Sequence, residues 1–176
     1  MLDKDYLLPI DALNLIINNV TKKVLRVEVL KIEECYNRIL AEDIYSPEYL
    51  PAFSRSTVDG YAVSSEDTYG ASESAPAYLT VKYDIPMGVV PDFKIGKLEA
   101  STIATGAMLP DGADAVVMLE NAQIVSNNMI EVIKPVASGE NVIQKGEDFK
   151  KGELIVKKGS KLRAQEIGAL GAVGIT

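Results

Sequence analysis

Apolar side chains near the amino end of the chain recur every three or four residues. They follow Pro9 and comprise Ile10, Leu13, Ile16, Ile17 and Val20. This spacing places them on one face of an α-helix, and a proline near the start suits the first helical turn. The pattern predicts an amphipathic helix over about residues 8–21.

The pattern then changes twice before residue 50. Leu25, Val27 and Val29 alternate with charged residues, which predicts a half-buried strand over 25–29. Helical spacing returns between 32 and 40, and the strand-like segment Asp43-Ile44-Tyr45 predicts another strand. The apolar positions of the helical run are Ile32, Cys35, Tyr36, Ile39 and Leu40.

Short β-type runs divided by turn residues fill the centre of the chain. Two of them are the alternating run 79–83 and the apolar run 115–118. The segments 122–125 and 129–133 flank Ser126-Asn127-Asn128, which predicts a hairpin. Short strands at regular spacing are typical of a small barrel or sandwich.

The carboxyl-terminal segment mixes strand and helix patterns again. Residues 153–156 predict a strand, a short helix begins at Arg163, and 174–176 look like the start of a further strand. The sequence therefore predicts a mixed α+β, β-rich fold. In this fold a small all-β, barrel-like domain, 51–136, is inserted into a discontinuous helix-and-strand linking domain, 1–50 and 137–176.

Composition supports a globular protein with a core. Of the 176 residues, 47% are hydrophobic and 24% are charged, unlike a disordered chain. No run of about 18 apolar residues would cross a bilayer. The acidic start MLDKDYLLPID also lacks the basic and apolar regions of a signal peptide. We therefore expect a cytoplasmic protein that does not bind membranes.

Charge and residue types narrow the chemistry. With 18 basic and 25 acidic side chains the net charge is −7, which argues against binding nucleic acid. The chain has no histidine and one cysteine, Cys35, which we expect to be a core thiol. An internal disulfide, the common zinc sites and Ser/His or Cys/His catalysis are thus excluded. Carboxylates, lysines, hydroxyls, backbone amides or a hard metal ion remain.

The first candidate segment is PAFSRSTVDGYA, residues 51–62. Asp59-Gly60 between apolar flanks is typical of a hairpin turn, which is the simplest interpretation. Alternatively, Asp59 presents its carboxylate from a loop, with Ser56 and Thr57 as hydrogen-bond partners. It would then hold Mg²⁺ through oxygen.

The second candidate segment contains Thr105-Gly106-Ala107 within 102–120. Small residues let the backbone approach an anion, and consecutive amides can form an anion-binding nest. The alternative is a simple loop between strands with Gly106 at positive φ.

The third candidate segment, 139–149, places Glu147 and Asp148 between Lys145 and the Lys150-Lys151 pair. It is either a solvated loop with weak surface ion pairs, or a segment in which Asp148 acts as a second oxygen ligand or as an orienting acceptor. Neither interpretation is favoured by the residues alone.

In this order the segments resemble the N-terminal half of the molybdopterin molybdenumtransferase family, MoeA, to which the E domain of gephyrin is also similar. The matching stretches cover nearly the whole chain; Val58 stands where many members have Met. They are PAFSRSTVDGYA at 51–62, IATGAMLPDGADAVVMLE at 103–120 and GENVIQKGEDFKKGELIVKKGSKLRAQEIGALGAVGI at 139–175.

The resemblance implies an enzyme that inserts molybdate into adenylylated molybdopterin, forms molybdenum cofactor and releases AMP. Family members continue into a MogA-type molybdopterin-binding domain and a small β domain. Their site lies between the β domain of one subunit and the molybdopterin-binding domain of the other. We therefore expect a homodimer and a MogA-type molybdopterin adenylyltransferase as partner. This piece would supply one wall of the site and be inactive alone.

The resemblance also implies the roles of individual residues. Molybdate and phosphates are anions, so carboxylates in their site call for a cation such as Mg²⁺. A different class remains open, a non-catalytic scaffold module of gephyrin type, which would be indifferent to these carboxylates. The resemblance implies Asp59, Thr105 and Asp148 as catalytic groups. The chemistry of the residues themselves adds Ser56, Gly106 and Ala107 as substrate-binding groups, and Asp59 and Asp148 as metal ligands.

Overall fold

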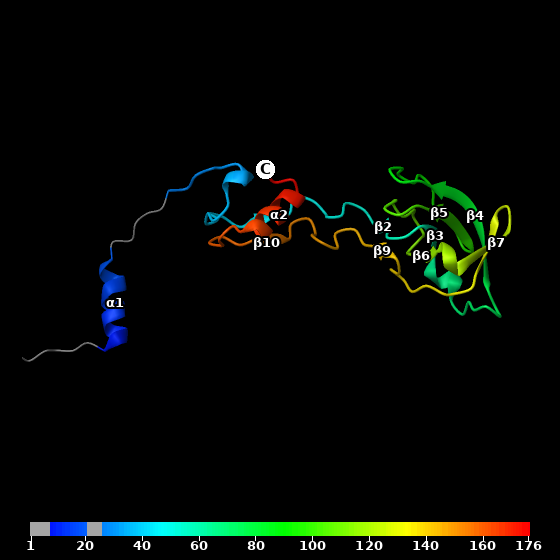
Figure 1. Cartoon of the computed structure of the whole chain (residues 1–176), viewed down its shortest axis with the longest axis horizontal. Helices are drawn as coiled ribbons and strands as arrows, with labels where there is room; N and C mark the ends of the chain where they lie inside the picture. The colour runs from blue at the N-terminus through cyan, green and yellow to red at the C-terminus, as the bar shows by residue number, and fades with distance from the viewer. Residues whose placement is uncertain (1–7, 21–25) are drawn as a thin grey trace, which may run out of the picture. The chain divides into compact units, whose positions relative to one another are not determined.

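The computed structural model describes residues 8–20 and 26–176 (Figure 1). The chain separates into two compact units, residues 1–31 and 32–176. Within the described residues, no helix combines the length and the apolar character that crossing a membrane requires.

The first unit contains helix α1, Pro9–Asn19, which confirms the predicted amphipathic helix. Pro9 lies at its start and Asp11 in its first turn, where a negative charge is favourable. No residue of α1 is buried, and Ile16 is 59% exposed. Within its own unit, the apolar face predicted from the spacing is therefore not covered.

The predicted strand 25–29 does not form among the described residues. Leu25 lies outside them, as does Thr21, the predicted end of the preceding helix. Residues 26–30 have no regular structure, and Val29 is 98% exposed. Alternation alone does not make a strand, because a strand also needs a neighbouring backbone to pair with.

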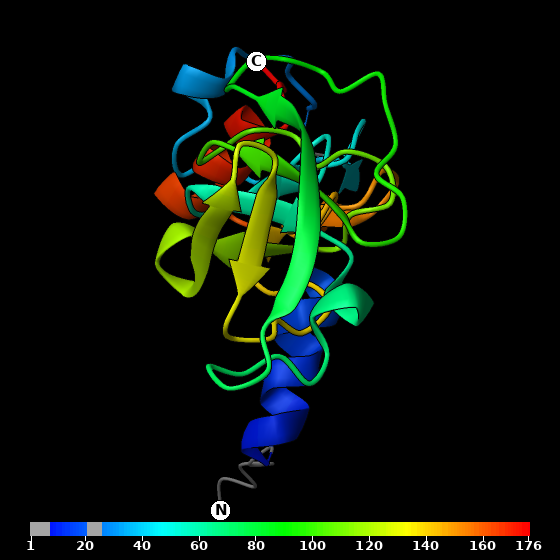
Figure 2. The same ribbon diagram turned by 90° about the vertical axis from the view of Figure 1, so that its right-hand side faces the viewer.

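The second unit is built on a curved six-stranded sheet in the order β6-β3-β5-β4-β8-β7. All neighbours are antiparallel except β4 and β5, which run parallel. Figure 2 shows long β4 beside the yellow β7–β8 hairpin. The strands are β3 (Gly60–Val63), β4 (Ala77–Ile85), β5 (Glu99–Ile103), β6 (Ala115–Met118), β7 (Ala122–Ser126) and β8 (Met129–Val132).

The sheet buries apolar side chains on both faces. Tyr61 and Val63 of β3 pack in one cluster with Leu79, whereas Ala62 between them packs in another with Ile85. The predicted runs at 79–83 and 115–118 and the hairpin at 122–133 are confirmed. Together with the helices, the sheet confirms the mixed, β-rich fold class.

The Asp59-Gly60 pair does not form a hairpin turn, so the simplest interpretation of this dipeptide was wrong. The strand before it, β2 (Arg55–Ser56), pairs with β9 (Val142–Ile143), while β3 pairs with β5 and β6. A Cβ on Gly60 would lie 2.0 Å from the carbonyl oxygen of Val117. The glycine is thus required for close approach of β3 and β6.

A separate apolar cluster forms around helix α2, Ala164–Ala172. Strand β1 (Ile44–Tyr45) pairs antiparallel with β10 (Leu154–Val156) beside it, which confirms both predicted strands. Leu170 of the helix is buried against Val156 and Leu162. Glu166 accepts a hydrogen bond from the Arg163 backbone N–H at 2.9 Å, and this cap fixes the predicted start of α2.

Two predictions in this region were wrong. Of the predicted helix 32–40, only Ile32–Glu34 is helical, and it forms a 3₁₀ turn. The α-helix does not form because the backbone of Asn37 has a left-handed φ of 65°. Residues 174–176 form no strand; Gly174 has a φ of 79°, and the Ile175 amide returns to the Leu170 carbonyl, closing the helix end. Cys35 packs against this cluster, as expected for a core thiol.

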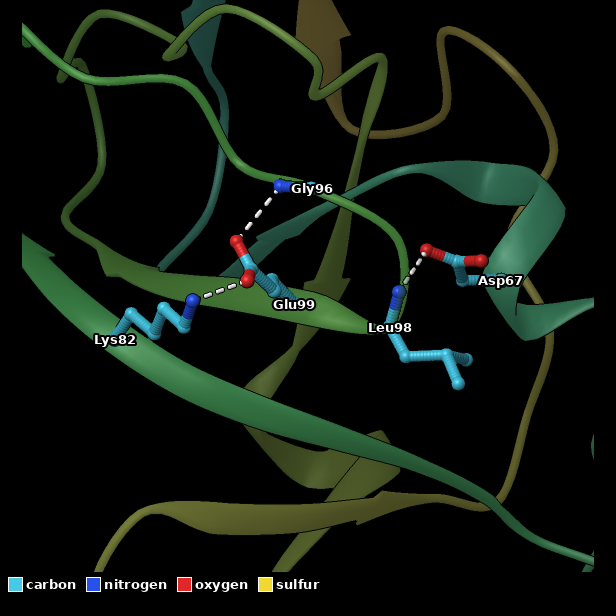
Figure 3. Close-up of polar contacts among 5 residues, drawn as sticks. All are labelled: Asp67, Lys82, Gly96, Leu98 and Glu99. Atoms are coloured by element: carbon cyan, nitrogen blue, oxygen red, sulfur yellow. Dashed lines mark hydrogen bonds and ion pairs between the residues drawn. The ribbon is translucent and has the colours of Figure 1, made fainter.

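The start of β5 is held by carboxylates on both sides (Figure 3). Glu99 accepts a hydrogen bond from the Gly96 amide at 2.8 Å and pairs with Lys82 of β4. Asp67 accepts one from the Leu98 amide at 2.7 Å. The hydrogen bond from Lys82 is the main cause that lowers the pKa of Glu99. These contacts support the parallel β4–β5 pair, whose opposite end carries the candidate site.

The six-stranded sheet lies within residues 60–132, and the α2 cluster draws on residues 32–44 and 155–175. This distribution accords with an insertion, but the domain limits 51–136, 1–50 and 137–176 stay a prediction.

Candidate functional site

A surface hollow of about 350 Å³ lies where the carboxyl ends of β4 and β5 meet. The parallel direction of these strands brings both ends to the same edge of the sheet. Asp59 and Gly60 contribute to the hollow from the start of β3. Its remaining lining comes from Asp84, Ile85, Pro86, Thr102, Ile103, Ala104 and Leu119.

Asp59 is held in place by Thr105, another residue that the resemblance singled out. The Thr105 backbone N–H and hydroxyl both donate to Asp59 Oδ1, at 2.7 and 2.9 Å. These bonds, the backbone one most of all, lower the pKa of Asp59 below its ordinary value. Asp59 is therefore a carboxylate at neutral pH. Its Oδ2 atom has no hydrogen bond within the described part of the chain.

Ser56 and Thr57, the predicted hydrogen-bond partners of Asp59, bond to other groups instead. Ser56 is 2% exposed, and its hydroxyl donates to the Val58 carbonyl at 2.6 Å. Thr57 donates its backbone N–H to the Asn141 carbonyl. The loop before Asp59 is thus closed on itself by Ser56, and Thr105 supplies the contact to the carboxylate.

The turn 105–107 is tied to β2 by its backbone. The Gly106 amide donates to the Ser56 carbonyl at 2.9 Å, and the Ser56 amide donates to the Ala107 carbonyl at 3.0 Å. The Ala107 amide is also bonded, to the Ala104 carbonyl. Binding of an anion by these amides stays a prediction, and it would require them to exchange their present acceptors. Gly106 has a φ of 80°, as the loop interpretation expected.

Asp148 does not line the hollow with Asp59. It lies exposed in the loop between β9 and β10, where its amide donates to the Leu50 carbonyl at 2.9 Å. No set of three or more His, Cys, Asp or Glu side chains suited to a metal ion occurs in residues 8–20 and 26–176. A metal ion shared by Asp59 and Asp148 stays a prediction.

Asp84 is the carboxylate that the sequence did not single out. It stands near the end of β4, and its Oδ1 atom accepts a hydrogen bond from the Thr102 hydroxyl of β5. The arrangement mirrors Asp59 with Thr105: each carboxylate is held through Oδ1 by a threonine. Only the parallel pairing of β4 and β5, with Asp84 opposite Thr102, brings Asp84 to the hollow.

A second hollow, of about 500 Å³, contains none of the residues that the sequence singled out. Lys94 and Lys97 line it together with Glu66 and Asp67. Asp67 already accepts the Leu98 amide, so part of this charge serves the fold. The hollow with Asp59 is therefore the candidate site.

Comparison with known proteins adds an independent line of support. A protein of Methanocaldococcus jannaschii is 42% identical over 156 residues, 88% of this chain and 36% of that protein. The molybdopterin molybdenumtransferase of Bacillus subtilis is 38% identical over 138 residues, 77% of this chain and 32% of the relative. The chain thus spans about a third of the length of the curated relatives it matches.

Solved structures and family models agree with these relatives. The crystal structure of the molybdopterin biosynthesis MoeA protein from Pyrococcus horikoshii OT3 superposes with a TM-score of 0.85 at 39% identity. The match covers 94% of this chain and 43% of that one. The model of the MoeA N-terminal region (domain I and II) matches residues 9–174. The chain therefore belongs to the MoeA N-terminal-region family.

Proposed function

We propose that this chain is the N-terminal part of a molybdopterin molybdenumtransferase. The complete protein would insert molybdate into adenylylated molybdopterin, with release of AMP. The observation that carries the proposal is Asp59, held as a carboxylate by Thr105 at the edge of a hollow, in a chain of the MoeA family. The described residues would form one wall of the active site.

The residues of the hollow fit a divalent cation. Asp59 and Asp84 are hard oxygen donors that line the same space, and each is oriented through Oδ1. Mg²⁺ is commonly held by one or two carboxylates together with substrate phosphates and water. When bound, the ion would neutralise charge on the phosphate and molybdate oxygens. Asp148 remains the alternative second ligand that the family resemblance implies.

In this proposal, Thr105 and Ser56 keep the negative charge of the Asp59 carboxylate in a fixed position. Thr105 keeps the Asp59 carboxylate oriented, so no reorganisation of that group is needed when substrate arrives. Ser56 keeps the preceding loop in shape through its bonds to Val58. The proposal also includes a homodimer, a MogA-type molybdopterin adenylyltransferase as supplier of substrate, and a cytoplasmic location.

The test is molybdenum insertion by the product of the complete gene, measured as molybdenum cofactor formed and AMP released. Asp59→Asn keeps the size of the side chain and an acceptor for Thr105 but removes the negative charge. We expect cofactor formation to fall at least about 100-fold, as for loss of a charge-stabilising group. Asp92→Asn is the matched control, because Asp92 is exposed and does not line the hollow.

Equal activity of the two variants would contradict the proposal and favour a scaffold module, which has no use for the Asp59 charge. The 176-residue chain assayed alone should release no AMP. Activity of this piece by itself would contradict the view that it forms only one wall.

A further inference from the structure

The loop that joins β4 to β5 begins at the candidate site. Because β4 and β5 are parallel, residues 86–98 must cross from one end of the sheet to the other. Pro86, the first of them, lines the hollow with Asp59. Farther along, Phe93 stacks on Tyr83 of β4 with ring centroids 3.8 Å apart. This stack ties the loop to the sheet, and residues 87–90 lie between it and Pro86 along the chain.

Met87 lies over the turn that holds Asp59. A Cβ built on Gly106 would be 3.3 Å from Met87 Cε and 3.8 Å from its Sδ atom. The thioether therefore packs on the residue next to Thr105, whose amide and hydroxyl bind Asp59. Yet Met87 is 73% exposed, so most of its surface faces no described residue.

The hollow beside Met87 has two kinds of lining. Ile85, Ile103 and Leu119 give it an apolar part, while Asp59 and Asp84 give it a charged part. A ligand that combines a flat ring system with phosphates would match both, provided that the proposed divalent cation lies between the phosphates and these carboxylates. The unbranched, polarizable thioether of methionine adapts to the faces and edges of aromatic rings.

We propose that Met87 contacts substrate: its thioether packs against a fused heteroaromatic ring of the adenylylated pterin, while the phosphates lie near Asp59 with the proposed divalent cation between them. This inference rests on the proposed function. Met87 would thereby favour substrates with a ring over compounds that carry only the phosphates. Because Gly106 has no Cβ, the thioether has room to lie over the 105–107 turn.

The kinetic test uses the product of the complete gene. Met87→Ala should raise KM for adenylylated molybdopterin about five-fold and leave KM for molybdate and kcat unchanged. Met87→Leu, which keeps an apolar side chain of similar size, should restore KM to within about two-fold. Val90→Ala is the control, since Val90 is 72% exposed in the same loop but, unlike Met87, has no atom within 4 Å of a Cβ built on Gly106. A KM for Met87→Ala equal to that of Val90→Ala would overturn the inference.

A second readout does not depend on turnover. In the same protein labelled with ¹³C at the methionine methyl groups, the Met87 signal is assigned by its loss in Met87→Leu. AMP or a pterin added at saturation should shift this signal through the ring current, upfield for contact with the ring face and downfield for contact with its edge, and the Met129 signal of β8 should stay in place. A shift of the Met87 signal caused by AMP would identify adenine as the ring in contact, and a shift caused by the pterin would identify the pterin ring. If neither ligand shifts the signal, the inference is overturned.

The outcomes separate this inference from the function on which it rests. Loss of activity in Asp59→Asn with no effect in Met87→Ala would retain the proposed function and reject the ring contact. A Met87 shift with AMP in a protein that inserts no molybdenum would retain the ring contact and reject the proposed function.

Discussion

At the scale of single residues, the site depends on which partner each carboxylate finds. The resemblance identified Asp59 and Thr105, and the structure brings them within hydrogen-bond distance. Asp84 was beyond sequence reasoning because its partner, Thr102, is a residue of the parallel neighbouring strand. Nothing in the local sequence around Asp84 indicates that this pairing exists.

The Asp59–Thr105 contact leads to a prediction about pKa values. Both donors of Thr105 lower the pKa of Asp59 from its ordinary value of 3.8, and the backbone N–H contributes more than the hydroxyl. Thr105→Ala removes only the hydroxyl. The Asp59 pKa should then rise but stay below 3.8, since the larger cause remains. Carboxyl ¹³C chemical shifts followed from pH 6 to pH 2 by NMR measure this midpoint.

Thr102→Ala is the control for this titration. It removes the same hydroxyl from the neighbouring carboxylate, Asp84, and leaves the donors to Asp59 in place. The Asp59 midpoint should not move. A midpoint that is equal in Thr105→Ala and in the unmodified protein would show that the hydroxyl does not hold the carboxylate.

At the scale of elements, prediction succeeded where one residue pattern decides the structure. The β7–β8 hairpin alternates around a clear turn, and α2 begins at its own cap. Strand β3 was missed because all four of its residues are buried, so it shows no alternation of apolar and polar positions. The predicted helix 32–40 failed because the backbone of one residue, Asn37, turns away from helical geometry.

Replacing glycine by alanine should change the free energy of unfolding in opposite directions at two positions, Gly60 and Gly168. Gly60→Ala would place a Cβ 2.0 Å from the Val117 carbonyl oxygen and force β3 away from β6. We expect the free energy of unfolding to fall by about 3 kcal/mol. Gly168→Ala lies in the interior of α2, where a Cβ meets nothing within 4 Å. This change should raise the free energy of unfolding by about 0.8 kcal/mol through helix propensity.

Urea unfolding followed by circular dichroism measures both variants under the same conditions. Because the substitution is identical, general effects of replacing glycine cancel in the comparison. Destabilisation by Gly168→Ala, or an unchanged midpoint in Gly60→Ala, would contradict the packing described here.

At the scale of the whole molecule, the negative charge of this chain means that the cations needed to bind anionic substrates must come from elsewhere. The net charge is −7, and residues 51–136 carry 11 acidic against 5 basic side chains. An acidic wall does not attract molybdate or phosphates by itself. The proposed site therefore requires cations from outside this wall, either a bound metal ion or basic groups elsewhere in the assembled enzyme. A chain that spans about a third of its relatives' length is consistent with that division.

The apolar face of α1, which is not covered within its own unit, gives the prediction for the chain as a whole. Leu13, Ile16 and Ile17 are each more than half exposed, and together with their neighbours they form a continuous helix face. Contiguous apolar surface of this kind binds hydrophobic dyes and promotes association. The 176-residue chain should therefore enhance the fluorescence of anilinonaphthalene sulfonate and show concentration-dependent mass in light scattering. Ile16→Lys should reduce both signals, whereas Asn18→Lys, the same charge within the same helix, should leave them nearly unchanged. A strictly monomeric chain without dye binding would show that this face is not open in solution.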